Sequence, residues 1–269
     1  MLFGRTYADT DTSWMLKIVG HTIVVYTGKG GTGKTALSIN LANYFASLGI
    51  PVILIDGDGQ RSASMLCRVP QDRRTMYEVL ERENKITLRD ILREISPNLW
   101  LAPGSNKLWG WRYNADGANA LRRVLTGAKG FLRIIDSGPA WTDLSEAAVE
   151  TADRLICPMQ PSTDDIVATH QLLTMLLNDN GWQHSLKANQ VGMVFTRVRK
   201  RTNLHRTALA RADQIPYHVF NTQIYESIAV QEASDKGKAI VTHNPRHQVA
   251  QQYATLAQEI AAWTIGGER

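Results

Sequence analysis

A glycine-rich segment of ten residues constrains the fold more than any other part of the chain. It reads TGKGGTGKTA (27–36), follows the apolar run TIVVYT (22–27) and leads into KTALSINLANYFASLG (34–49). The last stretch has an apolar residue at each helical turn, namely Leu37, Leu41, Phe45 and Leu48. Gly49 stands where that helix would end. We therefore predict a buried strand, a tight turn and a helix in direct succession, which is the opening unit of an α/β domain.

The same alternation continues along the chain and defines the fold class. Further apolar runs occupy 52–56, 99–102, 132–136, 154–158, 192–196 and 217–220, and helical patterns occupy 87–95, 143–152, 163–178, 203–213, 227–236 and 246–263. Runs that are apolar on both faces are typical of strands buried in a parallel sheet. We predict a single doubly wound, mostly parallel sheet with helices on both faces. Residues 1–20 form a short N-terminal extension, and 21–265 form one domain.

Composition excludes several classes of protein. Hydrophobic residues make up 43% of the 269 residues, which suffices for a full core. Cys67 and Cys157 are too far apart for a close-spaced metal motif, and no run reaches the roughly 18 apolar residues of a membrane span. We expect a soluble, cytoplasmic protein. The net charge of +5 permits an acidic partner without identifying one.

The glycine-rich segment matches a phosphate-binding loop. Gly28, Gly33, Lys34 and Thr35 fit the pattern G-x-x-x-x-G-K-[ST] in the required position between a strand and a helix. Glycines let backbone N–H groups surround phosphate oxygens, and the N-terminus of the helix adds a favourable dipole. Lys34 is expected to reach the β- and γ-phosphates, and the Thr35 hydroxyl to hold Mg²⁺. The whole set of expected nucleotide-binding residues is Gly28, Gly30, Gly31, Thr32, Gly33, Lys34, Thr35 and Ala36.

Carboxylates follow two other predicted strands. LIDGDGQ places Asp56, Asp58 and Gln60 beyond the end of one strand, where ligands of open α/β sheets bind. LRIIDSGPA places Asp136 after an apolar run, as in the Walker B carboxylate that contacts Mg²⁺ directly or through water. We expect the turn at 137–139 to sense the γ-phosphate.

Together these three segments resemble the deviant Walker A ATPases of the ParA/MinD family, with the closest match to ParA-like partition ATPases. KGGTGKT (29–35) is similar to the family's K-G-G-x-G-K-T, and DGDGQ (56–60) to its D-x-D-x-Q. DSGP (136–139) resembles D-T-P-P, with Ser and Gly replacing Thr and the first Pro. LICPMQPS (155–162) and VQEASDKGKAIV (230–241) resemble later family segments, so the resemblance spans about 20–263. The family often carries Ile-Pro near the base pocket, where this chain reads NTQIYES (221–227).

The resemblance implies roles for residues that a generic phosphate loop leaves unexplained. Lys29 corresponds to the signature lysine, which contacts the phosphates held by the second subunit of an ATP-bridged dimer. Asp58 corresponds to the residue that positions the attacking water, and Asp56 supports the metal shell. The catalytic set is thus Lys29, Lys34 and Asp58, the metal set is Thr35, Asp56 and Asp136, and the cofactors are ATP and Mg²⁺.

The resemblance also implies a cycle of partners. The ATP form would dimerise, bind DNA nonspecifically and associate with the nucleoid. A ParB-like partner or cargo adaptor would stimulate slow hydrolysis, which positions a plasmid, a chromosome region or a protein complex.

A basic segment is the candidate DNA contact. VFTRVRKRTNLHRTALAR (194–211) has no acidic residue, and its cations are Arg197, Arg199, Lys200, Arg201, Arg206 and Arg211. A run of charge is often only a solvated face. Because this run is unbalanced, and because the corresponding region binds DNA in the family that it resembles, we predict contacts to phosphates without base readout.

Other interpretations remain at this stage. A MinD-like membrane-bound switch would need a basic amphipathic helix at the C-terminus. The last twenty residues, AQQYATLAQEIAAWTIGGER, contain a single basic residue, Arg269. An iron–sulfur reductase of the nitrogenase type would need cysteines near 136–145, where there are none. A nucleotide switch that docks partners without DNA binding or hydrolysis stays open. LWGWRYNADG (108–117) is expected at the surface, its tryptophans used for packing or as a partner patch.

Overall fold

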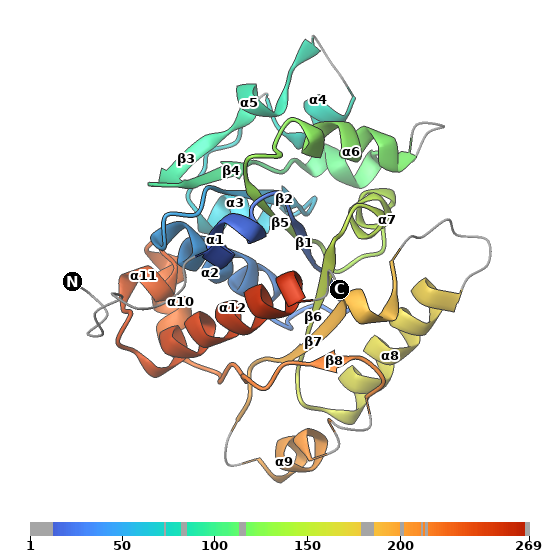
Figure 1. Ribbon diagram of the computed structural model, residues 1–269, viewed down its shortest axis with the longest axis vertical. Coiled ribbons are helices and arrows are strands. Elements are labelled where there is room, and N and C mark those ends of the chain that lie inside the picture. The colour runs from blue at the N-terminus through green and yellow to red at the C-terminus, as the bar shows by residue number, and fades with distance from the viewer. Residues whose placement is uncertain are drawn as a thin grey trace.

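The computed structural model describes residues 13–72, 74–81, 85–112, 117–178, 186–199, 202–210, 212 and 215–266 (Figure 1). Within these residues one sheet has the strand order β3-β4-β2-β5-β1-β6-β7-β8. All neighbouring pairs are parallel except β3 and β4. The strands are β1 (Thr22–Val25), β2 (Val52–Gly57), β3 (Arg93–Ser96), β4 (Leu99–Ala102), β5 (Leu132–Ser137), β6 (Arg154–Met159), β7 (Val191–Phe195) and β8 (His218–Val219).

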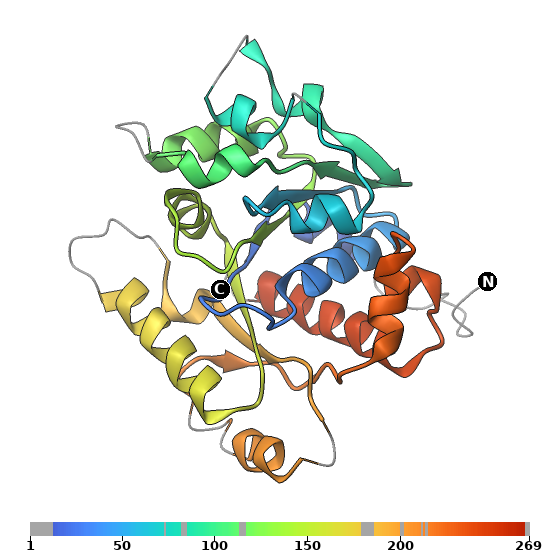
Figure 2. The ribbon, with the colours of Figure 1, turned by 180° about the vertical axis from the view of Figure 1, so that it is seen from behind.

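Helices cover both faces of this sheet, as the alternating pattern predicts (Figures 1 and 2). One group consists of α1 (Ser13–Ile18), α2 (Lys34–Ser47), α3 (Ser62–Leu66), α10 (Ile228–Asp235), α11 (Ile240–His243) and α12 (Gln248–Gly266). The other group consists of α4 (Met76–Leu80), α5 (Leu88–Ile91), α6 (Gly117–Thr126), α7 (Asp143–Glu150) and α8 (Thr163–Asn178). Short elements outside these groups are α9 (Asn203–Leu209) and the 3₁₀ helices η2 (Asn106–Gly110) and η3 (Ala188–Gln190).

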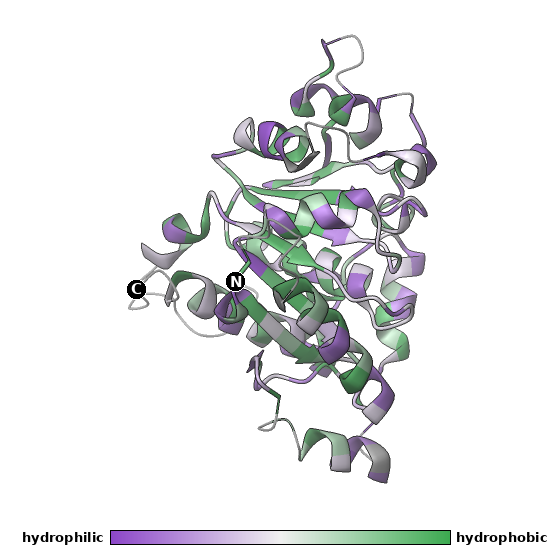
Figure 3. Cartoon of the chain, turned by 90° about the vertical axis from the view of Figure 1, so that its right-hand side faces the viewer, coloured by the Kyte–Doolittle hydropathy of each residue, from purple (hydrophilic) through white to green (hydrophobic). Residues whose placement is uncertain are grey.

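Alternate residues of each central strand supply two separate cores. In β1, Ile23 and Val25 pack with α2 and α12, whereas Val24 packs with the residues of the opposite face. This division follows from the period of two along a strand. Figure 3 shows the resulting layers, with hydrophobic strands in the middle and hydrophilic residues on the outer helix turns. The predicted single doubly wound sheet is confirmed.

Helix α2 forms as predicted, and its two ends have a physical cause. Its N-terminus follows Gly33, whose φ of 87° is in the left-handed region that glycine tolerates. Leu37, Leu41 and Phe45 are fully buried along one side. Gly49, with a φ of 88°, terminates the helix.

The prediction of a helix over 87–95 is wrong in its second half. Thr87 and Asp90 do form the expected capping box, because Thr87 N and Oγ1 both donate to Asp90 Oδ2. However, α5 ends at Ile91, and Arg93–Ser96 becomes β3, paired antiparallel with β4 across a turn in which Asn98 has a φ of 63°. Hairpin pairing with a neighbouring strand has outweighed the local helical pattern.

Two surface features complete the frame. Part of the segment assigned to an extension, α1, packs on α12, with Ile18 fully buried. In the tryptophan-rich stretch, Trp111 is buried, whereas Trp109 keeps 51% of its surface exposed. The two tryptophans therefore have different environments, and the remainder of that stretch, 113–116, lies outside the described residues.

Candidate functional site

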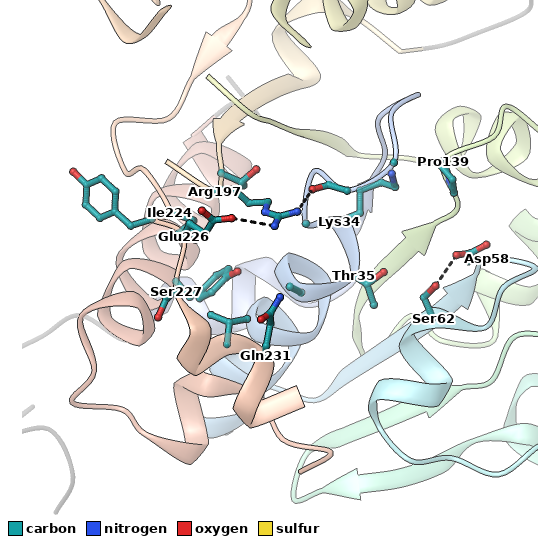
Figure 4. Close-up of a pocket in the computed structure, with 18 of the residues that line it drawn as sticks. Lys34, Thr35, Asp58, Ser62, Pro139, Arg197, Ile224, Glu226, Ser227 and Gln231 are labelled. Carbon is teal, nitrogen blue, oxygen red and sulfur yellow. Dashed lines mark hydrogen bonds and ion pairs between the residues drawn. The ribbon is translucent and has the colours of Figure 1, made fainter. Parts of the chain in front are cut away.

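A cavity of about 510 Å³ lies at the carboxyl ends of the central strands, beside the glycine-rich loop (Figure 4). Parallel strands and the helices that follow them place the loops after β1, β2, β5 and β7 at the same edge of the sheet. These loops and the helices α2, α3, α10 and α12 line the cavity. The lining residues are Gly30, Gly31, Gly33, Lys34, Thr35, Ala36, Asp58, Gln60, Ser62, Ser137, Pro139, Thr196, Arg197, Ile224, Tyr225, Glu226, Ser227, Ile228, Val230, Gln231 and Tyr253. Most of the expected nucleotide-binding residues are present, and Gly28 and Thr32 lie outside this lining.

Lys34 is held inside the loop. Its side chain is buried, and Nζ donates to the backbone oxygens of Lys29 at 2.8 Å and Thr27 at 3.3 Å. Burial lowers the pKa of Lys34, an effect opposed by Asp136 and Asp58. The loop curls around this ammonium because Gly31 adopts a left-handed φ of 76°. A preorganised cation at the start of a helix is suited to a polyphosphate.

Asp136 is the candidate metal carboxylate, and one of its oxygens is open. It is fully buried, and Oδ1 accepts a hydrogen bond of 2.9 Å from Ser38, while the nearby Thr35 hydroxyl acts to lower the pKa of the same carboxylate. Oδ2 has no hydrogen-bond partner among the described residues. Burial, with a smaller contribution from the neighbouring Asp56, raises the pKa of Asp136 to about 7. A buried carboxylate oxygen beside a hydroxyl is a donor set that suits Mg²⁺ completed by phosphate oxygens, so these residues fit that ion.

Asp56 lies next to Asp136 in the paired strands β2 and β5, but its oxygens are already engaged. Oδ2 accepts from the backbone N and the hydroxyl of Ser64, and Oδ1 accepts from the backbone N of Asp58 at 3.2 Å. Burial raises the pKa of Asp56 to about 6 despite these bonds. Its position therefore suits support of Asp136 more than direct contact with a metal.

Asp58 lines the cavity and is held by its own turn. Oδ1 accepts from the Gln60 backbone N, and Oδ2 accepts from the Ser62 hydroxyl, both at 2.9 Å (Figure 4). A Cβ atom at Gly138 would lie 2.8 Å from Asp58 Oδ1. The glycine that departs from the D-T-P-P pattern thus leaves room for this carboxylate.

Lys29 is not part of the cavity lining and pairs within its own chain. Nζ donates to Asp165 Oδ1, at the start of α8, and this bond raises the pKa of Lys29. Half of the Lys29 side chain is exposed, whereas Asp165 is almost completely buried. Asp165 is fixed in turn, because its Oδ2 accepts from the Gln160 backbone N. The buried carboxylate of Asp165 therefore holds the half-exposed, flexible lysine side chain at the rim of the site.

The outer wall, which we define as Ile224–Gln231, was not assigned a role from the sequence. Backbone bonds attach it to the end of β7: Ile224 N donates to Phe195 O, and Val198 N donates to Ile224 O. The sequence signal in this region was the departure of NTQIYES (221–227) from the Ile-Pro that the resemblance leads us to expect. Its own residues lacked a recognisable pattern.

Arg197 belongs to the rim of this site. Its guanidinium donates to Gly31 O at 2.9 Å and to Glu226 Oε1 at 3.1 Å (Figure 4). Arg199 donates to the same glutamate through Nε at 2.5 Å. Two of the predicted DNA contacts are therefore already paired with a carboxylate.

Arg206 is the other described member of the basic segment. It is exposed on α9, where it donates to Asn203 Oδ1. Lys200, Arg201 and Arg211 lie outside the described residues. No helix in the described part of the chain has the length and apolarity needed to cross a membrane.

Comparisons with known proteins agree on the family. A family model, the CobQ/CobB/MinD/ParA nucleotide binding domain, matches residues 23–240. The chromosome-partitioning ATPase Soj of Thermus thermophilus is 30% identical over 253 residues, which cover 92% of this chain and 98% of that protein. The sporulation initiation inhibitor protein Soj of Bacillus subtilis is 28% identical over 255 residues, covering 91% and 99%. Among solved structures, an ATP complex of a McdA variant from Cyanothece has a TM-score of 0.78 at 20% identity, covering 92% of this chain and 97% of that chain, which is a likeness of fold.

Proposed function

The chain belongs to the CobQ/CobB/MinD/ParA family of nucleotide-binding domains, and from that premise we propose that it is an ATP-dependent switch that partitions or positions a cargo. Its reaction is the hydrolysis of ATP to ADP and phosphate. The ATP form pairs two chains and binds DNA nonspecifically, and a partner protein stimulates hydrolysis to release them. The name of the Thermus thermophilus relative, a chromosome-partitioning ATPase, supports partition of a chromosome, and the cargo here is a plasmid, a chromosome region or a protein complex.

The observation that carries this proposal is the contrast between the two lysines of one loop. Lys34 is buried and bonded to loop carbonyls, which suits it to phosphates bound in its own subunit. Lys29 is half exposed and held only at the rim by Asp165. On release from Asp165, Lys29 is free to meet phosphates in a second subunit, where a cation contributes only when two chains close.

The chain's own groups suffice for the positioning that hydrolysis requires. Lys34 and the backbone N–H groups of Gly33 and Thr35 bind the phosphates, and Asp58 orients the attacking water through a carboxylate oxygen. Bound Mg²⁺, held by Thr35 and Asp136 with Asp56 behind them, would neutralise charge on the phosphate oxygens. The outer wall encloses the opposite side of the cavity and supplies the surface for the base.

Binding of DNA is proposed through the basic segment, led by Arg206 and Arg199. If about five phosphates are neutralised, the logarithm of affinity should fall with the logarithm of salt concentration with a slope of about −4 to −5. Arg206→Ala should reduce that slope by about 1 for every DNA sequence. A matched control is Arg122→Ala, because Arg122 is an exposed helical arginine that also donates to an asparagine three residues earlier, Asn119. It lies on α6, at the other end of the molecule (Figures 1 and 2).

A switch that docks partners without DNA is the second candidate. The observation that favours it is the pairing of Arg197 and Arg199 with Glu226, which offsets part of the basic charge.

One experiment tests the proposal and separates these two candidates. The molar mass of the protein is measured by light scattering on a sizing column with ATP or with ADP, and retention on DNA is measured under the same conditions. We expect two chains and DNA retention with ATP only. A dimer that ignores DNA at low salt supports the second candidate, and a monomer with ATP contradicts both.

A further inference from the structure

An exposed tryptophan touches the turn that carries Asp58. Trp109 belongs to η2, which follows β4, and it lies against Gly59. A Cβ atom built on Gly59 would be 2.1 Å from both Cδ1 and Nε1 of the indole, so no side chain fits there while Trp109 keeps its place. Gly59 separates Asp58 from Gln60, and both of those residues line the cavity.

The 3₁₀ helix that carries Trp109 is firmly anchored. Leu108 and Trp111 on either side are buried, with exposed fractions of 2% and 1%. The Ser105 hydroxyl accepts from the Lys107 backbone N at the start of η2, and Lys107 Nζ donates to Glu78 at 2.8 Å. The backbone of η2 is therefore fixed independently of Trp109, whose indole alone reaches Gly59.

The stretch that precedes η2 is tied to the same turn. Arg61 Nε donates to Gly104 O at 3.1 Å, and Gly104 N donates to the Ser64 hydroxyl at 3.1 Å. Ser64 in turn donates to Asp56. The segment leaving β4 and the segment leaving β2 thus form one bonded unit, with the indole closing its outer side.

We propose that Trp109 is a positioning residue for ATP hydrolysis, which holds the Asp58–Gln60 turn against the cavity by packing on Gly59. This inference rests on the proposed function, since the turn carries the residue assigned to the attacking water. Because the indole keeps half of its surface open, it can be lifted from Gly59 without disturbing the anchors of η2. Displacing the indole frees the turn, and small displacements of a catalytic group cost much of its rate.

The test uses a cycle of variants at the two touching positions. Trp109→Ala should lower kcat by about 10-fold to 100-fold and change the KM for ATP by less than about 3-fold. Gly59→Ala should do the same, because the new methyl group displaces the indole. The double variant should lose no more than Trp109→Ala alone, since the two changes break one contact. Trp109→Phe should recover part of the rate.

Two further arms separate positioning from a merely structural role. Met65→Ala removes an apolar side chain of similar exposure, 57%, from the neighbouring α3 and should leave kcat unchanged. Amide hydrogen exchange should accelerate over 57–62 in Trp109→Ala and stay unchanged over β1 and β5. If Trp109→Ala fails to fold, Gly59→Ala decides the question, because η2 retains its anchors in that variant.

The outcomes are distinguishable from failure of the proposed function. If the wild type does not hydrolyse ATP, the proposed function fails, and the exchange rates over 57–62 still decide whether Trp109 holds the turn. Unchanged kcat or unchanged exchange in Trp109→Ala overturns the positioning role. Additive losses in the double variant also overturn it.

Discussion

The inner and outer halves of the phosphate loop are built in different ways. The inner half, Gly33–Ala36, is secured by backbone groups of the loop itself, because the buried Lys34 donates to the carbonyls of Thr27 and Lys29. The outer half, Lys29–Gly31, is secured by distant side chains. Asp165 holds Lys29, and Arg197 and Gln160 both donate to Gly31 O.

This difference separates two tasks within eight residues, 29–36. A group bonded only to its own loop is in place before any ligand arrives, which suits binding. A group held by breakable contacts to other elements changes position when those contacts change, which suits a switch. We therefore expect the outer half to change position when the segments that carry Asp165, Gln160 and Arg197 move.

Replacing Lys34 should produce the largest effect, because Lys34 is the preorganised cation of the inner half, which binds the phosphates. Lys34→Ala removes a charged donor and should weaken ATP binding by about 10-fold to 100-fold. Isothermal titration with ATP and Mg²⁺ measures this directly. The matched control comes from the same loop: Lys29→Ala should keep the affinity within about 3-fold of the wild type. Equal losses in the two variants would remove the distinction between the halves.

Replacing the partners of the outer half should affect pairing of chains more than binding. Lys29→Ala should reduce ATP-dependent dimer formation by at least about 10-fold, because phosphates of the second subunit lose their cation. Asp165→Asn should have the opposite sign, with dimer formation at about 5-fold lower ATP concentration, because the carboxylate no longer retains Lys29. Analytical ultracentrifugation across an ATP series measures both.

Asp164→Asn is the control for the second variant, since Asp164 is the exposed carboxylate next to Asp165. It should change dimer formation much less than Asp165→Asn does, because Asp164 attracts Lys29 through its charge and Asp165 also accepts a hydrogen bond from it. A wild-type response from Asp165→Asn, together with the expected loss in Lys29→Ala, would show that Asp165 does not retain the lysine.

The inner half was predictable from sequence because its structure is local. The order of strand, glycine-rich turn and helix follows from residues 22–49, and the positions of Lys34 and Thr35 follow from a spacing that the phosphate chemistry demands. The parallel direction of the central strands follows from the same alternation, whereas their order was not predicted. Strand β3 was missed because its stability comes from pairing with β4, while its own residues continue a helical pattern.

The outer features were not predictable because they join segments far apart in the chain. Lys29 and Asp165 are 136 positions apart, and no sequence pattern near either residue predicts that the two are in contact. Gly138 departs from the family pattern for a reason visible only in three dimensions, the approach of Asp58. Gly59 likewise belongs to a recognisable motif, but its contact with Trp109 depends on how β4 and η2 are placed.

The smallest expected effect is at the rim, where Glu226 couples the outer half to the outer wall. Hydrogen bonds from Arg199 and Arg197 hold the pKa of Glu226 below its usual 4.5. A carboxylate whose pKa is lower in the folded state than in the unfolded state stabilises the fold at pH values above its unfolded-state pKa. This stabilisation is lost as the pH falls through the lowered folded-state pKa. Glu226→Gln should therefore reduce the free energy of unfolding by less than about 1 kcal/mol at pH 7, because the pair is partly exposed.

The difference from wild type should vanish in acid and shrink in high salt. Urea unfolding at pH 7 and below pH 4 measures it, with the exposed Glu232→Gln on α10 as control. A loss that persists unchanged in acid would show that Glu226 acts by packing, and the rim would then be as self-contained as the inner half.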